Sequence, residues 1–457
     1  MISRSRFNCK RLADYKSERP IMSKKITAGL ALLTLLCLCS GSFLPLGHAQ
    51  TGAAGTAQNA AIVSTTAAVL KETSELRELP ILKSVKSGAQ SRAEIERMII
   101  RNLDDETTPA EMHAAEMTLK AFGLAPQDFA YRPFLVKLLT EQVAGYYDPK
   151  AQEFYLADWI ELEGQKPVMA HELTHALQDQ HFNLKRFENW PKGDSDAELA
   201  AHALIEGDAT LAMTLYMAKN PLVALAFIRS LGGQEVVTEQ FKQAPRALRE
   251  SLLFPYEQGS AWATQLYKRG GWEMVSQAFT KLPQSSEQIL HADKYFSYEA
   301  PQKLTLPDFK AALGPTWKKL DYDVNGEWGY YLILDEFLND ATESKQASAG
   351  WGGDRFELYE TGTPGEFFVA QLTAWDTPLD AEEFFNAYGR RTAKRYPDAK
   401  ELKSDDDRFV WQTSSGRVAL ELRGSHVAIV EGVPASTDAN KLLNAIWQQD
   451  KGSNKQN

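Results

Sequence analysis

The stretch VMAHELTHALQDQH, residues 168 to 181, holds three of the eight histidines in this chain. Pro167 suits the first turn of a helix, and the apolar residues that follow favour a helix that is largely buried. On such a helix His171 and His175 lie one turn apart on the same face, so both imidazoles can point at a single ion. Glu172 lies on the adjacent face, where its carboxylate can reach a water beside the ion rather than the ion itself. The stretch therefore predicts a helix that carries part of a metal site, although two histidines alone are equally explained as ordinary residues of a half-buried helix.

His181 is one candidate for the third metal ligand. It follows His171 by ten residues, the spacing of HExxHxxGxxH sites, but Gln178 stands where those sites have the glycine that ends the helix. If the helix continues through Gln178, the side chain of His181 points away from that of His175. Helix capping or packing is then the expected role of His181.

Two other candidates lie in a second predicted helix, GDSDAELAAHALIEGDATLAM, residues 193 to 213. Glu198 closes a capping box that begins at Ser195, which explains Glu198 without a metal. Glu206 shares a stripe with apolar residues, and burying its charge costs free energy unless a metal ion or a buried Arg or Lys lies beside it. Beside it, Gly207 lets two helices approach closely, and Asp208 is expected to accept a hydrogen bond from a ligand histidine.

HELTH followed by a glutamate on the next helix resembles the gluzincin branch of the zincin metallopeptidases, whose zinc ligands are His, His and Glu. The resemblance implies that His171, His175 and Glu206 bind one Zn²⁺ ion and that Glu172 acts as general base. The wider wording, including GYYDPK, HELTHALQDQHF, ALIEGDA, LPQSSEQILH and GWGGDR, is similar to a largely uncharacterised group of exported predicted metallopeptidases from bacteria and haloarchaea. Thermolysin-like enzymes carry an aspartate four residues after the ligand glutamate, whereas this chain has Thr210 there, so the resemblance extends to the branch and not to that family. Zinc is the default metal, because a site of two histidines and one glutamate also accepts other divalent ions.

The N-terminus has the features of a secretory signal. Residues 22 to 49 combine Lys24 and Lys25, an apolar run and a small-x-small ending, and the start at Met22 is the expected one. The apolar run is shorter than the ~20 residues that cross a bilayer, and no later segment is long and apolar enough to do so. We therefore expect residues 1–49 to be a removed signal peptide, and the protein to be periplasmic or extracellular without stable membrane insertion.

The composition of the exported part limits its chemistry and its partners. All three cysteines (Cys9, Cys37 and Cys39) lie in the signal segment, so a metal site must use histidines and carboxylates. Without residues 1–49, which carry 8 Lys and Arg against 2 Asp and Glu, the formal charge falls from -10 to -16. This acidity argues against nucleic acid as a partner. The sequence does not indicate an oligomeric state.

The predicted fold class is α+β, in two domains. We expect a flexible tether over residues 50–90, a mainly helical, zincin-like domain with a small β-hairpin over 91–315, a smaller C-terminal α+β domain over 316–450 and a disordered tail over 451–457. The polar, glycine-rich segment Glu343 to Gly353 is the expected joint, and residues 351 to 354 look like a tight turn there. Alternating aromatic strands in the C-terminal domain are explained either as core or as a recognition surface.

The predicted hairpin directly precedes the histidine helix. Its strands, Val143 to Tyr147 and Glu153 to Asp158, are each candidates to present an edge to a substrate backbone, unless their aromatic residues only pack the sheet. Tyr256 and His291 are the candidates to stabilise the oxyanion formed when a carbonyl is attacked. His202 lies one turn before Glu206 and is a candidate to hydrogen-bond a ligand.

These observations predict an exported zinc peptidase. Glu172 would take a proton from water and pass it to the leaving amine of a protein or peptide substrate. The alternative is a non-catalytic envelope protein that binds a protein or a cell-wall component. The presence of all three ligands and the base favours the enzyme.

Overall fold

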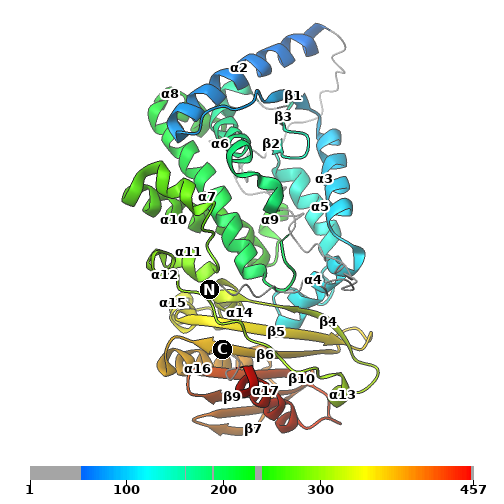
Figure 1. Ribbon diagram of the computed structural model, residues 1–457. Coiled ribbons are helices and arrows are strands. Elements are labelled where there is room, and N and C mark those ends of the chain that lie inside the picture. Colours follow the sequence, from blue (N-terminus) through cyan, green and yellow to red (C-terminus); the bar gives the residue numbers. More distant parts are fainter. Residues whose placement is uncertain (1–52, 160, 188–189, 232–238, 454–457) are drawn as a thin grey trace, which may run out of the picture.

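Two long helices, α6 (Leu162–Phe182) and α7 (Ser195–Lys219), form the centre of the N-terminal part of the molecule (Figure 1). Both are apolar or small-residue-rich around most of their circumference, as expected for helices surrounded by other elements. The structure is a computed structural model, and it describes residues 53–159, 161–187, 190–231 and 239–453. The expected signal peptide, residues 1–49, lies outside the described residues.

The other elements of the N-terminal part surround these two helices. They are α2 (Ala53–Arg77), β1 (Lys86–Gln90), α3 (Arg92–Glu106), α4 (Pro109–Phe122), α5 (Tyr131–Gln142), β2 (Gly145–Asp148), β3 (Glu153–Ala157), the 3-10 helix η1 (Leu184–Phe187), α8 (Pro221–Leu231), α9 (Glu239–Lys242), α10 (Arg246–Ala278), α11 (Ser286–Leu290) and α12 (Ala292–Ser297).

The segment expected to be a flexible tether, residues 50–90, is instead structured from Ala53 onward. Its helix α2 buries Ile62, Val69 and Leu70 in a core shared with α6. The prediction was wrong because alanine favours a helix and the few large apolar side chains fall on one face, which is enough to cover a neighbour.

The small sheet has the strand order β1-β3-β2. The hairpin predicted before the histidine helix is present, with β2 antiparallel to β3. Strand β1 was not predicted and pairs parallel to β3. Because β3 is paired on both sides, the segment Glu153 to Asp158 is not an available edge, and of the two predicted strands only β2 lies at an edge of the sheet.

The C-terminal part is an antiparallel sheet covered by helices on both faces. Its elements are α13 (Lys310–Leu313), β4 (Lys318–Asp323), α14 (Gly326–Leu338), α15 (Ala341–Ser348), β5 (Trp351–Glu360), β6 (Phe367–Trp375), α16 (Pro378–Arg395), β7 (Lys400–Asp405), β8 (Arg408–Thr413), β9 (Gly416–Arg423), β10 (His426–Val433) and α17 (Ala439–Ser453). The seven strands have the order β4-β5-β6-β10-β9-β8-β7. The α+β fold class predicted from the sequence is thus confirmed. Because α17 ends at Ser453, the expected tail over 451–457 begins within a helix.

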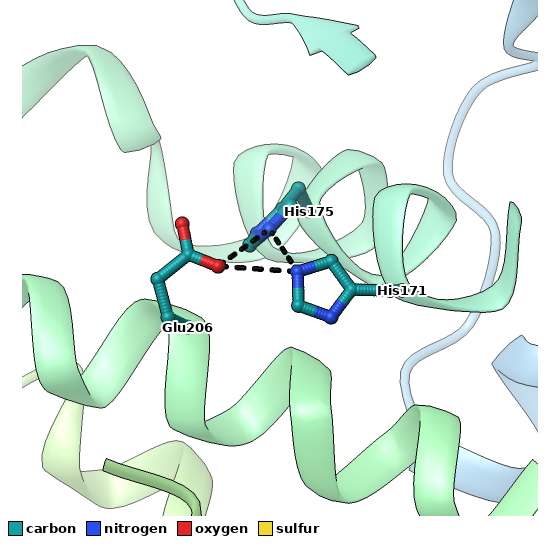
Figure 2. Close-up of side chains that lie close together, drawn as sticks. All are labelled: His171, His175 and Glu206. Carbon is teal, nitrogen blue, oxygen red and sulfur yellow. Dashed lines mark hydrogen bonds and ion pairs between the residues drawn. The ribbon is translucent and has the colours of Figure 1, made fainter. Parts of the chain in front are cut away.

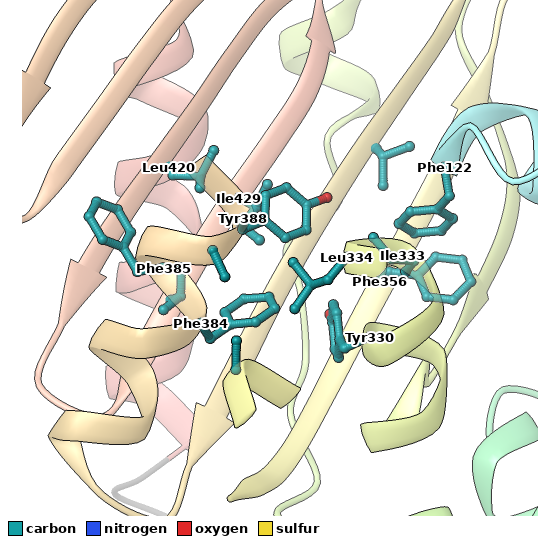
Figure 3. Packing of buried hydrophobic residues seen from close by; sticks show 14 of the residues in the cluster. Phe122, Tyr330, Ile333, Leu334, Phe356, Phe384, Phe385, Tyr388, Leu420 and Ile429 are labelled. Atoms are coloured by element: carbon teal, nitrogen blue, oxygen red, sulfur yellow. The ribbon is translucent and has the colours of Figure 1, made fainter. Parts of the chain in front are cut away.

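The aromatic strands of this sheet serve as core. On one face they pack against α14 and α16, where Tyr330, Phe384 and Tyr388 are fully buried (Figure 3). On the other face α17 and the segment around Phe309 cover a second core. Strands buried on both faces read as nearly continuous apolar runs, which explains FFVAQLTAW in β6.

The expected joint between the two parts, Glu343 to Gly353, is not a linker. It forms α15 and the first residues of β5, and the supposed turn at 351–354 is a β-bulge opposite Trp375. The buried carboxylate of Asp354 holds this region by accepting hydrogen bonds from the backbone of Asn325 and Gly326 and from the indole of Trp351. Glycines here permit a bulge rather than a hinge.

The two parts share a continuous core through the end of α4. Phe122 packs edge-on against Phe356 of β5 with ring centroids 5.3 Å apart. Arg391 and Arg395 of α16 donate to the backbone carbonyls of Phe122 and Ala121, both at 2.6 Å. The carbonyls at the end of a helix need such donors, so the C-terminal part completes a helix of the N-terminal part.

Within the described ranges, no single helix is long and apolar enough to cross a membrane. Helix α7 and residues Pro221–Ser230 satisfy the length and composition criteria only as a pair, which is bent by 113°.

Candidate metal centre

The centre lies where α6 passes α7. Helix α6 is buried almost continuously from Gly164 to Asp179. Helix α7 also packs against α10, and the two helices approach so closely that a Cβ on Gly207 would lie 2.2 Å from the carbonyl oxygen of Gly259. The predicted close approach at Gly207 is therefore confirmed, but its partner is α10 and not the histidine helix.

His171, His175 and Glu206 bring three ligand atoms together, as the sequence predicted (Figure 2). The Nε2 atom of His171 lies 3.1 Å from both Glu206 Oε2 and His175 Nε2, and His175 Nε2 lies 3.4 Å from Glu206 Oε2. All three residues are buried, and the most exposed of them, Glu206, is 4% exposed. The triad could hold a metal ion.

The electrostatics of the triad are those of a site that needs a cation. Burial opposes a charge on His175, but the carboxylates of Glu206 and Glu172 raise its pKa to about 9. Burial likewise opposes a charge on Glu206, but His175 and His171 lower its pKa to about 2. A proton on His175 therefore balances Glu206 in this arrangement, and a divalent ion among the three ligand atoms would take its place.

Glu172 lies beside the triad without joining it. Its Oε2 accepts a hydrogen bond of 2.9 Å from the backbone N–H of Tyr147 on β2, which fixes the carboxylate. Its Oε1 is buried and has no hydrogen-bond partner among the described residues. Burial raises the pKa of Glu172 well above its ordinary value. A carboxylate with one fixed and one available oxygen, and a raised pKa, has the properties of a general base.

A chain of polar side chains supports His175 from behind. Its Nδ1 lies 2.9 Å from Gln178 Oε1, and Gln178 Nε2 donates to Asp208 Oδ2 at 2.8 Å. Asp208 in turn forms a two-point ion pair with Arg77 of α2, at 2.6 and 3.2 Å. The sequence predicted Asp208 as the direct acceptor of a ligand histidine, and this was wrong because Gln178 lies between them. Acceptors of this kind fix the tautomer and orientation of a metal-binding imidazole.

The structure also settles the rival ligands. Helix α6 continues through Gln178 to Phe182, and His181 Nε2 instead contacts the carbonyl of Pro80 at 2.7 Å. The predicted capping box at Ser195 is wrong by one residue, because Asp194 is the N-cap and accepts from Ala197 N. Glu198 lies two turns before Glu206, outside the triad.

The start of α6 also differs from the prediction. Pro167 is not at its first position, since the helix begins at Leu162. The additional residues pack against α8, where Gly164 lies against Ser230. This neighbour stabilises the turn that precedes the proline.

The two residues predicted to stabilise an oxyanion have different positions. The ring of Tyr256 stacks on the imidazole of His171, with centroids 6.1 Å apart and 25° between the planes. His291 does not join the centre: it contacts Glu327 Oε1 at 2.8 Å and lines another cavity, of about 500 Å³, between α10 and α14. The break between α11 and α12 directs His291 toward α14, which its distance along the sequence could not reveal.

A cavity of about 80 Å³ gives access to the triad from the side of His175 and Glu206. Its wall includes Tyr147 of β2, Phe187 of η1 and His202 of α7. Burial lowers the pKa of His202 to about 4, so this ring is neutral near pH 7. Its Nε2 has no hydrogen-bond partner among the described residues.

Comparison with known proteins adds a similarity in the C-terminal part. Residues 315–443 match a domain described as "Domain of unknown function (DUF8575)". The match begins just before β4 and ends within α17, so the triad and Glu172 lie outside it. No curated protein and no solved structure matches the chain.

Proposed function

We propose that the protein is a zinc-dependent peptidase that hydrolyses peptide bonds with Glu172 as general base. The observation that carries the proposal is the combination of a buried His171, His175 and Glu206 triad with a neighbouring buried carboxylate that has an available oxygen. Neither part alone would suffice, because buried ion pairs and buried acids both occur in purely structural roles.

The triad fits zinc in chemistry and in size. Two neutral imidazoles and one carboxylate are a donor set typical of catalytic zinc, which leaves a fourth position open. Tetrahedral bonds of ~2.0–2.1 Å place ligand atoms about 3.3–3.4 Å apart. The three separations of 3.1 to 3.4 Å are close to that value, so little movement is needed to close the ligands around an ion.

When bound, zinc would supply a polarised carbonyl and a water of lowered pKa. The residues of the chain then account for the remaining steps. Glu172 Oε1 accepts a proton from that water, and the burial that raises the pKa of Glu172 helps it to hold the proton. The same oxygen then donates the proton to the leaving amine.

The β2 strand is the element best placed to orient a substrate. It is an edge of the small sheet, and it contacts α6 through the hydrogen bond that Tyr147 N donates to Glu172. An extended peptide can add to such an edge by backbone hydrogen bonds. With the export expected for residues 1–49, the substrates would be proteins or peptides in the periplasm or outside the cell.

The test compares Glu172→Gln with wild type and with Glu163→Gln, a control on the same helix whose side chain is 63% exposed. Each purified protein is assayed for zinc content and for casein cleavage. We expect all three to bind zinc and Glu172→Gln to lose cleavage by about 10²- to 10⁴-fold, the contribution typical of a general base. Full activity of Glu172→Gln would contradict the proposal. Zinc binding by a wild type that cleaves nothing would instead support the alternative of a binding protein.

A further inference from the structure

A second cavity adjoins the metal centre. It has a volume of about 250 Å³, against about 80 Å³ for the cavity at the triad. His202 lines both cavities. The two cavities are therefore neighbours that share one buried residue, which is only 6% exposed.

The second cavity lies between the two parts of the molecule. Helices α4, α5, α7 and α10 form its N-terminal side. The C-terminal part contributes β4, β5 and α14, and with them Val324, Leu332, Ile333 and Phe356. The matched domain of unknown function thus supplies one wall of a cavity next to the candidate centre.

The chemistry of the lining favours an apolar occupant. Most of its side chains are aliphatic or aromatic, among them Leu119, Leu135, Leu199 and Leu248. Among the described residues, the lining contains the carboxylates of Glu198, Asp321 and Asp323 but no Lys or Arg. This charge disfavours an acidic side chain. An apolar cavity of ~150 Å³ is large enough to hold benzene, so 250 Å³ accommodates a leucine or phenylalanine side chain.

Helix α7 sets the distance between this cavity and the reaction. Its N-terminus is fixed to the end of β4, where Ser195 N donates to Asp323 Oδ1 at 2.8 Å. At 1.5 Å per residue, His202 lies ~6 Å and Leu199 ~10 Å before Glu206 along the axis. An extended peptide advances ~3.4 Å per residue, so the cavity wall at His202 lies about two residues, and the wall at Leu199 about three residues, from the bond at the metal.

We propose that this second cavity binds a large apolar side chain of the substrate, within about three residues of the scissile bond, so that the C-terminal part helps to select the peptide. The inference rests on the proposed peptidase function. His202, whose buried Nε2 has no hydrogen-bond partner among the described residues, is the residue that the linings of the two cavities share. The occupant is therefore an aliphatic or aromatic side chain such as that of leucine or phenylalanine.

The test uses substitutions that change the size of the cavity in opposite directions. Ser251→Phe on α10 inserts a benzyl group, and Leu332→Ala on α14 enlarges the cavity from the C-terminal part. Ser260→Phe is the control, because it makes the same change on α10 at a residue that lines neither cavity. Zinc content and thermal unfolding of each variant show that it is folded.

Casein is digested with each protein, and the residues around the cleaved bonds are identified by mass spectrometry. We expect wild type and Ser260→Phe to favour leucine, phenylalanine or similar residues at one position within about three residues of the bond. Ser251→Phe should lower cleavage at those sites by 10- to 200-fold relative to sites with alanine or glycine, the range for misfit in an apolar pocket. Leu332→Ala should shift the preference toward tryptophan. A preference for Lys or Arg, or the same preference in all four proteins, would overturn the proposal.

A binding measurement separates failure of this proposal from failure of the proposed function. Zinc-loaded protein is titrated with acetohydroxamate and with 3-phenylpropanohydroxamate, which differ in the apolar group beside the metal-binding head. We expect the phenyl compound to bind at least tenfold more tightly to wild type and to lose that advantage in Ser251→Phe. Equal affinities, or no measurable binding of the phenyl compound, would overturn the cavity assignment. Because this readout needs no cleavage, it holds even if the protein hydrolyses nothing.

Discussion

Removal of Arg77 tests whether the N-terminal helix α2 belongs to the candidate centre. The Arg77 side chain is fully buried, and its ion-pair partner among the described residues is Asp208. It also donates to Ser276 Oγ at 3.1 Å and lies over the Trp272 ring, 4.4 Å from the centroid. Arg77→Met keeps most of the length of the side chain but removes the charge and its hydrogen bonds.

The expected loss of stability follows from the buried carboxylate that Arg77→Met leaves behind. Asp208 would stay buried as a carboxylate, with the Gln178 amide as its remaining hydrogen-bond donor among the described residues. Leaving one partner of a buried ion pair unpaired typically costs about 3–5 kcal/mol of unfolding free energy. In contrast, Arg132→Met breaks an exposed pair with Asp104, which contributes about 0–1 kcal/mol.

Urea unfolding of the metal-free proteins, followed by circular dichroism, measures both changes. We also expect the double variant Arg77→Met/Asp208→Leu to be more stable than the sum of the single effects by roughly 1–3 kcal/mol, because it removes both charges together. A loss below about 1 kcal/mol for Arg77→Met would refute the reasoning, since an exposed pair would explain that value. Equal losses for Arg77→Met and Arg132→Met would refute it as well.

Three further predictions concern the surroundings of the triad. Gln178→Leu removes the partner of His175 Nδ1 and should weaken zinc binding 10- to 100-fold. A competition titration with a chelator measures this affinity, and an unchanged value would show that the imidazole needs no hydrogen-bond support. Gly207→Ala should lower the free energy of unfolding in urea by about 1–3 kcal/mol or more, because the new Cβ would overlap the α10 backbone. The control Thr214→Ala, on the exposed side of α7, should change it by less than about 0.5 kcal/mol. Burial lowers the pKa of His202 from 6.5 to about 4, so its contribution to stability is present above pH 6.5 and is lost as the pH falls to 4. His202→Gln should therefore remove about 3 kcal/mol of the loss of stability between pH 7 and pH 4, and an unchanged pH dependence of stability would contradict this prediction.

The part of the centre that sequence could predict is the part set by local spacing. His171, His175 and Glu172 fall on fixed faces of one helix, and three or four residues of spacing determine which side chains meet. Glu206 was identifiable because a charge within an apolar stripe needs a partner. The spacing along the helix also made Gln178 identifiable as a partner of His175, since Gln178 lies three residues after it.

The features that the sequence did not predict depend on contacts between segments far apart in the chain. Arg77 lies 131 residues before Asp208, and nothing in its own neighbourhood indicates that partner. His291 was assigned to the centre from its residue type alone, and tertiary packing carries it to Glu327 instead. The tether was misjudged for a related reason, because the few apolar side chains on one face of α2 are buried against α6, which lies far away in the sequence.

The most direct test of the central claim is the zinc content of the purified protein, measured by mass spectrometry of the metal beside Glu206→Gln and Glu198→Gln. Both variants remove one carboxylate from the same helix, but only Glu206 belongs to the triad. The account predicts one zinc per chain in wild type and in Glu198→Gln, and its loss in Glu206→Gln. Wild-type protein without zinc, or equal zinc in all three proteins, would contradict it.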